Sequence, residues 1–285
     1  MIARAKLLVL LLAFAVSPLV AGEMREQSME SAALGRTWSY SVYLPDGYDG
    51  STARYPVIYL LPGLSVRRGG WLELALPTLV DAQIAAGTMK RPIVVVPEIG
   101  ASWGIDGRER MQTALAEELP AEIERLFRTM PGRGGRAIAG ISAGGFAALR
   151  LAMLHPDRYA AVALLSPAIY VPEPPANSGA RRSAVFGAHD FDPAIWQTLN
   201  YPALLPGFRA AGVSLPLYVG SGTADALGIA AHAIRLDAVW REIGMTAQLR
   251  LIDGGHTYAV WRALLVDALG FLLHCTDPDA VPTSR

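Results

Sequence analysis

Short apolar runs alternate along this chain with segments of helical periodicity, and this alternation limits the fold more than any other feature. Apolar stretches of strand length occur at 38–44, 55–61, 92–96, 136–141, 159–165, 215–219 and 246–252. Segments that suit helices occur at 71–86, 113–128, 143–155, 229–243 and 258–272. Pro120 must interrupt the second of these helices or begin a new one. Strands that alternate with helices need crossover connections, which predicts an α/β fold with a mostly parallel central sheet and helices on both faces.

No linker or internal repeat divides the chain. The least regular stretch is 167–214, which is rich in Pro, Gly, Ala and Arg. A weakly patterned insert of this length favours a cap over a site rather than a second domain. We therefore expect a single α/β domain over residues 23–285, with a variable insert at about 167–214.

The first 22 residues have the pattern of a secretory signal peptide. Arg4 and Lys6 give a charged start, residues 7–16 form an apolar run, and 20–22 are small enough for a cleavage point. The alternative is a buried first helix. The run is too short to span a bilayer comfortably, and we expect no stable membrane span after cleavage. The pattern predicts an exported bacterial protein, either periplasmic or secreted.

Charge and cysteine content exclude several classes of protein. Lys plus Arg and Asp plus Glu number 25 each, which argues against nucleic acid or an anionic membrane surface as the main partner. Apolar residues make up 52% of the chain, enough for a large core. Cys275 is the only cysteine, so no disulfide can form within the chain and stability must come from the core.

The sequence Gly-Ile-Ser-Ala-Gly at 140–144 lies between an expected strand and an expected helix. It matches the Gly-x-Ser-x-Gly nucleophile elbow, in which a sharp strand-to-helix turn exposes the serine hydroxyl and small neighbours allow close approach. The pattern alone is weak in a chain with 28 glycines, and the alternative is a tight turn that only packs a helix on a strand. The flanking strand and helix favour Ser142 as a nucleophile.

A serine nucleophile needs a base, and the chain offers five histidines. His256 follows the last expected strand in a Gly-Gly-His loop, and α/β sheets place their sites at the ends of strands. His155 and His274 lie at helix ends, where a role in stabilising the helix dipole is simpler. His189 falls in the insert and His232 in a helix. We predict His256 as the general base.

The third member of a triad should follow a strand between the serine and the histidine. Asp225 ends the loop after the strand at 215–219 and can accept the histidine N–H. The rival is Asp253, which is too close in sequence to His256 to face it easily. The order Ser142, Asp225, His256 is the chain order of α/β-hydrolases.

Two backbone N–H groups should stabilise the oxyanion. One is expected from Ala143, the residue after the nucleophile. The other should come from the loop after an early strand, and Leu64 in the stretch Leu-Pro-Gly-Leu-Ser at 61–65 is our choice. Trp103 and Tyr258 are candidate substrate-binding aromatics. Arg67 and Arg68 meet either an anionic substrate or, as adjacent arginines more often do, solvent.

The chain resembles the family of α/β-hydrolases described as "Putative esterase" in four stretches, 59–64, 140–146, 218–225 and 255–261. This family includes S-formylglutathione hydrolases of the esterase D type, feruloyl and acetylxylan esterases, enterochelin esterases and mycolyltransferases. The resemblance implies an α/β-hydrolase fold without a metal or organic cofactor. Many relatives have His-Gly where this chain has Pro62-Gly63.

Together these features predict a serine esterase that hydrolyses carboxylic esters through an acyl-enzyme on Ser142. The partner would be a small-molecule or carbohydrate-linked ester. Two alternatives stay open: acyl transfer to a sugar or another alcohol, and an inactive family member that binds carbohydrate or protein.

Overall fold

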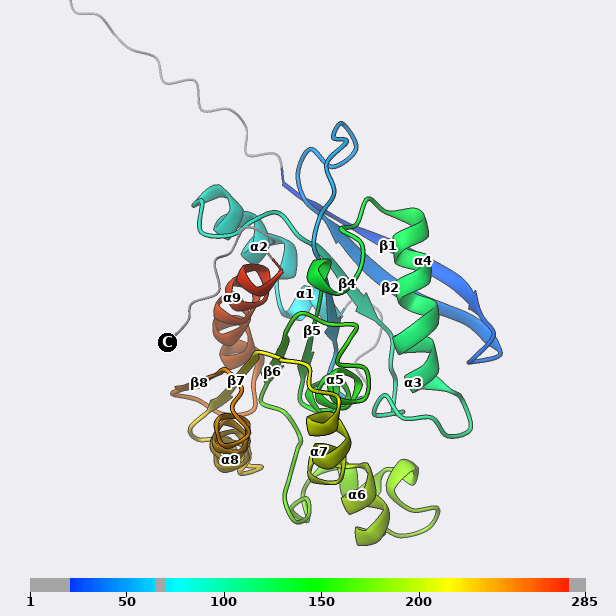
Figure 1. Ribbon diagram of the computed structural model, residues 1–285, viewed down its shortest axis with the longest axis vertical. Helices are drawn as coiled ribbons and strands as arrows, with labels where there is room; N and C mark the ends of the chain where they lie inside the picture. Colours follow the sequence, from blue (N-terminus) through cyan, green and yellow to red (C-terminus); the bar gives the residue numbers. More distant parts are fainter. Residues whose placement is uncertain (1–20, 65–69, 277–285) are drawn as a thin grey trace, which may run out of the picture.

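A single eight-stranded sheet forms the centre of the molecule (Figure 1). The computed structural model describes residues 21–64 and 70–276. Most of the expected signal peptide (1–20) therefore lies outside the described residues, as do Arg67 and Arg68. The strands are β1 (Glu23–Ser31), β2 (Arg36–Leu44), β3 (Val57–Leu61), β4 (Ile93–Pro97), β5 (Arg136–Ile141), β6 (Val162–Leu165), β7 (Leu217–Gly222) and β8 (Ala247–Ile252).

The strands follow the order β1-β2-β4-β3-β5-β6-β7-β8. β1 pairs antiparallel with β2, and β2 pairs antiparallel with β4. Every pairing from β4 through β3, β5, β6 and β7 to β8 is parallel. The prediction of a mostly parallel α/β sheet is thus confirmed. The loops that follow β3 to β8 leave from one edge of the sheet, where sites of such folds lie.

Helices cover both faces of the sheet, as predicted (Figure 1). They are α1 (Gly70–Glu73), α2 (Leu76–Ala85), α3 (Met111–Thr113), α4 (Leu119–Leu126), α5 (Ala143–Leu154), α6 (Pro193–Leu199), α7 (Tyr201–Ala210), α8 (Ile229–Glu242) and α9 (Tyr258–Cys275). A π-helical turn at Ala114–Glu118 joins α3 to α4. Pro120 lies where this π-helical turn passes into α4, so the predicted interruption is a change of helix type and the helical run continues through the proline.

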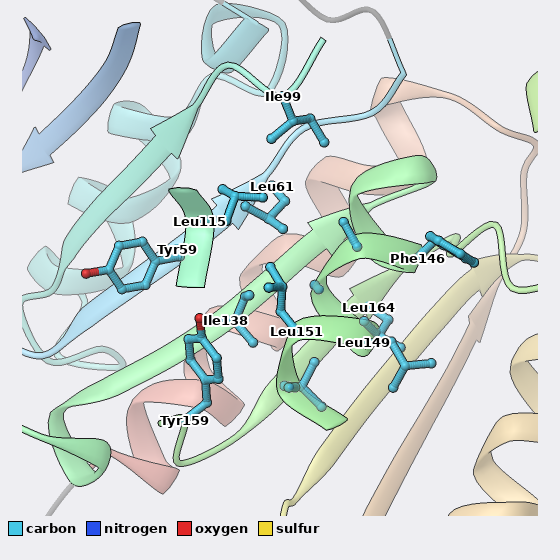
Figure 2. Packing of buried hydrophobic residues seen from close by; sticks show 14 of the residues in the cluster. Tyr59, Leu61, Ile99, Leu115, Ile138, Phe146, Leu149, Leu151, Tyr159 and Leu164 are labelled. Atoms are coloured by element: carbon cyan, nitrogen blue, oxygen red, sulfur yellow. The ribbon is translucent and has the colours of Figure 1, made fainter. Parts of the chain in front are cut away.

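The apolar side chains of the central strands alternate between two cores. On β3, Val57, Tyr59 and Leu61 face the core beneath α5, while Ile58 and Leu60 face the core beneath α2 and α9. This period of two is the side-chain pattern of a strand. Because both faces are covered, the strands read as continuous apolar runs. Figure 2 shows the first core, in which Phe146 and Leu149 of α5 lie over the sheet.

By length and composition alone, helix α9 is apolar enough to cross a membrane, a test that the core helix of a soluble protein also passes. It has 18 residues and a mean hydropathy of 1.4. One face of the helix carries seven buried residues, Val260, Leu264, Leu265, Ala268, Leu269, Leu272 and Leu273. These pack in the core that α9 shares with the sheet and α2.

The insert at 167–214 is more regular than its composition suggests, because it contains α6, α7 and two 3-10 turns. It packs firmly on α5. The Trp196 ring stacks on Phe146 with centroids 5.3 Å apart, and its N–H donates to the Tyr170 carbonyl over 3.1 Å. The buried Arg150 guanidinium of α5 donates to the Leu199 carbonyl.

Candidate active site

Ser142 occupies the sharp turn between β5 and α5. Its backbone has φ 54° and ψ −115°, a conformation that a residue other than glycine adopts only when its surroundings impose it. The surroundings do so through hydrogen bonds: the Ser142 N–H donates to the Leu165 carbonyl over 3.0 Å, and the Ser142 carbonyl accepts from Ala168 over 3.0 Å. The turn leaves the side chain half-buried rather than enclosed.

The glycines on either side of the serine are required by close backbone approach. A Cβ at Gly140 would collide with the Gly144 carbonyl oxygen, and a Cβ at Gly144 would collide with the carbonyl oxygens of Leu61 and Pro62. The second contact shows that the loop after β3 runs directly over the first turn of α5. This is the physical reason for small residues in the motif.

His256 lies between Ser142 and Asp225. Its Nε2 is 3.0 Å from the Ser142 Oγ, and its Nδ1 is 2.8 Å from the Asp225 Oδ2. The Asp225 side chain is fully buried, whereas the His256 side chain is 22% exposed. The structure thus brings together the three side chains that the sequence singled out. Both distances are those of hydrogen bonds, so a proton can pass from the hydroxyl to the imidazole.

Backbone hydrogen bonds join the loops that carry the acid and the base. The Thr223 N–H donates to the Ile252 carbonyl and the Ala224 N–H donates to the Gly254 carbonyl, each over 2.8 Å, which extends the β7–β8 ladder beyond the strands. The second carboxylate oxygen of Asp225 accepts the Leu227 N–H over 2.9 Å. The carboxylate is therefore held from two sides.

Among the described residues, the imidazole hydrogen-bonds Asp225 and Ser142 and not the rival Asp253. It is exposed, and its carboxylate is 3.5 Å from the Thr223 hydroxyl. Among the other histidines, His189 and His274 are exposed. His232 accepts the Val171 N–H over 3.2 Å, and burial lowers its pKa. His155 ends α5, where burial lowers its pKa as well.

The predicted oxyanion donors lie at the same edge of the sheet as Ser142. Because Leu61 pairs with Gly140, the oxyanion loop (Pro62–Leu64) leaves β3 beside the nucleophile. Ala143 is the first residue of α5, and the first N–H groups of a helix have no partner within it. Within the described part of the chain, neither the Ala143 nor the Leu64 N–H donates to another backbone carbonyl. No backbone carbonyl of the described residues thus competes with a substrate for these two N–H groups.

The insert reaches the loops on both sides of the nucleophile. Gly179 lies against the Leu64 side chain, so that an added Cβ would stand 2.6 Å from a Leu64 methyl group. The Asn177 amide donates to the Ala226 carbonyl over 3.4 Å, next to Asp225. Residues 177–179 thus lie between the oxyanion loop and the acid loop.

Trp261 contacts the base directly, which its apolar helical spacing alone did not indicate. Its ring meets the His256 imidazole edge to face, with centroids 4.9 Å apart and an angle of 88°. Tyr258 packs on Trp261 in the same manner. Both rings line an apolar cavity of about 20 Å³ with Pro62 and Ile141. The signal that would have found Trp261 is its place one turn into the helix that follows His256.

Trp103 stands in a different setting. Its side chain is 2% exposed and packs against Phe146 and Phe186. This position favours a packing role over contact with a ligand.

Among the described residues, no group of three His, Cys, Asp or Glu side chains could hold a metal ion.

The fold and the Ser-His-Asp geometry are those of an α/β-hydrolase. Comparison with known families gives the same result, since the family model described as "Putative esterase" matches residues 31–272. The chain belongs to this family. The expected resemblance and the expected α/β-hydrolase fold are both confirmed.

The first two curated relatives are longer than this chain, which spans less than two thirds of the length of either. The chain is 29% identical to an endo-1,4-beta-xylanase/feruloyl esterase of Xylanibacter ruminicola. The alignment spans 216 residues, which are 71% of this chain and 29% of the relative. The chain spans 55% of the next relative, a Corynebacterium glutamicum protein, at 25% identity. Among solved structures, a ferulic acid esterase has a TM-score of 0.76 at 23% identity, covering 90% of this chain and 99% of that structure.

Proposed function

We propose that this chain is a serine carboxylic-ester hydrolase that works through an acyl-enzyme on Ser142. The observation that carries the proposal is the pair of hydrogen bonds that joins the Ser142 hydroxyl to His256 and His256 to the buried Asp225 carboxylate. A serine hydroxyl is a weak nucleophile unless a base is within hydrogen-bond reach, and here it is.

The mechanism follows from these contacts. The Ser142 Oγ attacks the ester carbonyl carbon while His256 Nε2 takes the hydroxyl proton, and Asp225 stabilises the imidazolium that forms. The N–H groups of Ala143 and Leu64 bind the oxyanion. Collapse of the tetrahedral intermediate breaks the bond to the alcohol, which leaves with the proton from His256. Water then attacks the acyl-enzyme with His256 again as base, which releases the acid and restores Ser142.

Two further expectations are part of the proposal. Residues 23–285 form one domain, because strands from Glu23 to Ile252 share one sheet and α9 packs back on it. The protein is exported by a signal peptide at 1–22, because charged, apolar and small residues follow one another there as in such peptides. The names of the relatives, feruloyl and ferulic acid esterase, support ester hydrolysis as the reaction class.

Hydrolysis of p-nitrophenyl esters from acetate to laurate tests the proposal. The mature chain should turn over at least the short esters, and Ser142→Ala should lose several orders of magnitude in kcat. The profile over chain length measures the acyl pocket. Turnover that survives in Ser142→Ala would show that another group carries the reaction.

A further inference from the structure

The beginning of β1 is fastened to α2 through Gly22, the residue that precedes the strand. The Gly22 nitrogen lies 3.1 Å from each of the two carboxylate oxygens of Asp81 in α2. The Tyr43 hydroxyl of β2 donates to the same carboxylate over 2.5 Å. A Cβ at Gly22 would stand 2.5 Å from the Tyr43 side chain, so Gly22 packs directly on that ring. One carboxylate thus joins β1, β2 and α2.

The geometry at Asp81 suits an ammonium group better than a peptide N–H. A peptide nitrogen carries one hydrogen, and a hydrogen that lies between two oxygens meets both at a poor angle. An ammonium group carries three hydrogens and can donate to both oxygens at once. Its hydrogen bonds to a carboxylate are also about twice as strong as neutral ones. A nitrogen that is equally close to both oxygens is therefore the arrangement of an ion pair.

Asp81 has no cationic side chain as its partner within the described part of the chain. Its hydrogen-bond donors there are the Gly22 nitrogen and the Tyr43 hydroxyl, and no Arg, Lys or His side chain forms an ion pair with it. Arg91 acts on Tyr43 through its charge but makes no ion pair with Asp81. Asp81 is half-buried, and a carboxylate taken partly out of water is stabilised by a cation beside it. A positive charge on the Gly22 nitrogen would supply that cation.

The other charged groups around Gly22 also favour a cation at this position. A cleft of about 260 Å³ beside Gly22 is lined by four charged side chains, those of Glu23, Arg25, Asp46 and Asp49. The guanidinium group among them binds two of the three carboxylates, and one positive charge cannot neutralise both. With Asp81 and Arg91 included, four carboxylates surround this end of β1 against two guanidinium groups. The local charge is thus negative before any charge on Gly22 is counted.

Removal of the signal peptide would place a charge on this nitrogen. The sequence pattern permits cleavage after Ala21 or after Gly22, because both residues are small. We propose that the bond cut during export is Ala21–Gly22, so that Gly22 begins the mature protein and its ammonium group is the ion-pair partner of Asp81. Hydrolysis of this bond leaves a carboxyl group on Ala21 and an α-amino group, protonated at pH 7, on Gly22.

The cleavage point thus lies one residue before the end of the segment 1–22 that the sequence suggests. Cleavage after Gly22 would remove the nitrogen that Asp81 binds and the residue that packs on Tyr43. It would also free the beginning of β1, an edge strand that pairs with β2 alone. The inference rests on the proposed export and does not depend on the esterase reaction.

The first residue of the exported protein tests the cleavage point. The full chain, residues 1–285, is expressed in a bacterium, purified from outside the cytoplasm and analysed by intact mass and by its N-terminal peptide. We expect this peptide to begin at Gly22. A peptide that begins at Glu23, or at any other residue, overturns the inference. Retention of residues 1–21 on a cytoplasmic protein overturns the export itself, while its turnover of p-nitrophenyl acetate still supports the esterase.

Thermal unfolding of two chains with defined first residues tests the ion pair. One begins at Gly22, and the other begins at Ala21, which keeps the Gly22 N–H as a peptide group and moves the charge by one residue. At pH 7 the chain that begins at Gly22 should melt about 1–3 °C higher. An α-amino group titrates near pH 8 in an unfolded chain, and a neighbouring carboxylate raises its pKa in the folded one. The difference should therefore be complete below about pH 8 and vanish by about pH 10.

Two variants show whether Asp81 is the partner. Asp81→Asn keeps an acceptor for the Tyr43 hydroxyl but carries no charge, so it should bring both chains to the same melting temperature at pH 7. Asp46→Asn is the matched control, because Asp46 lines the neighbouring cleft without binding the Gly22 nitrogen, and the difference should remain. Tyr43 stays protonated throughout, since burial and the hydrogen bond to Asp81 raise its pKa. Equal melting temperatures of the two unsubstituted chains at pH 7, or a difference that persists in Asp81→Asn, would overturn the ion pair.

Discussion

Replacement of Asp225 by asparagine should reverse the direction of the hydrogen bond between His256 and Ser142. In the native site one Asp225 oxygen accepts the Leu227 N–H over 2.9 Å and the other lies 2.8 Å from the His256 Nδ1. An asparagine has only one oxygen. If it keeps the bond to Leu227, its NH₂ group faces Nδ1 and donates to it. The imidazole must then carry its proton on Nε2. That nitrogen donates to the Ser142 Oγ, so it cannot accept the proton of the Ser142 hydroxyl.

The opposite rotamer of the amide would preserve the imidazole tautomer, but it would leave the Leu227 N–H facing another donor. An unsatisfied buried N–H costs about 1–3 kcal/mol, and the lower end applies to the partly buried Leu227 N–H, so the inactive arrangement is favoured about five-fold or more. The same aspartate-to-asparagine change in the Ser-His-Asp triad of a serine protease lowers kcat by about 10⁴. The molecules left in the active arrangement also lack the carboxylate charge that stabilises the imidazolium, so we expect a total loss of about 10³ to 10⁴ in kcat for Asp225→Asn, with the melting temperature nearly unchanged.

Stopped-flow release of p-nitrophenol from p-nitrophenyl acetate measures this loss, because the first turnover reports acylation alone. Asp253→Asn is the control: its carboxylate is exposed and is not among the hydrogen-bond partners of His256 in the described residues, so its acylation rate should match the wild type. An Asp225→Asn variant within tenfold of the wild type would refute the idea that Asp225 sets the tautomer. An equal loss in Asp253→Asn would mean that the acid has been assigned to the wrong residue.

Three further predictions concern the surroundings of the triad. Gly144→Ala should lower kcat about 10²-fold or more, because the added Cβ collides with carbonyls at the oxyanion loop. Gly134→Ala adds a Cβ in open space and should leave kcat unchanged in the same ester assay. Trp261→Leu should lower kcat about tenfold, because it removes the ring that packs on His256. Trp261→Phe should restore most of the activity. Equal rates for the two variants would argue against positioning of His256 by an aromatic ring. Burial lowers the pKa of His232 in the folded protein below the 6.5 of the unfolded chain. As pH falls, the unfolded state therefore binds a proton before the folded state does. The stability that this difference contributes is fully present above pH 6.5 and declines as pH falls below it. His232→Asn keeps a hydrogen-bond acceptor but cannot titrate. In urea unfolding, its free energy of unfolding should fall less steeply with decreasing pH than that of the wild type. An unchanged slope would exclude His232 as the source of the pH dependence.

Much of the fold could be predicted from the sequence because its central strands are buried on both faces. β3, β5 and β6 are continuous apolar runs, and each lies where the sequence indicated. The glycine-flanked Ser142 and the Gly-Gly-His loop at His256 are local signals of the same kind. The pairing of Ser142, His256 and Asp225 in space is not local, and only the order of the strands supplies it.

The edge strand β1 gave no such signal. Its residues 23–31 are mostly polar and only Ser31 is buried, so the strand shows no apolar run in the sequence. The expected helix at 71–86 is split in the structure, with Ala75 at φ 52° between α1 and α2. Pro77 explains the break, since its ring in an unbroken helix would clash with the carbonyl of Glu73.

The helices of the insert could not be predicted because they are short and contain several prolines. α6 begins with Asp192 as N-cap and Pro193 as first residue, and α7 is capped by Asn200. Both are recognised start signals, but Pro206 within α7 obscures the periodicity. What stabilises this region is the contact of Trp196 with α5, which depends on tertiary packing and has no local pattern.

Covalent labelling with a fluorophosphonate, followed by peptide mapping of the mature chain, tests the central claim most directly. The reagent phosphonylates only a serine that a neighbouring base activates. We predict one adduct, on the peptide that contains Ser142, absent in Ser142→Ala and strongly slowed in His256→Ala. No adduct, or an adduct on another serine, would contradict the assignment of Ser142 as the nucleophile.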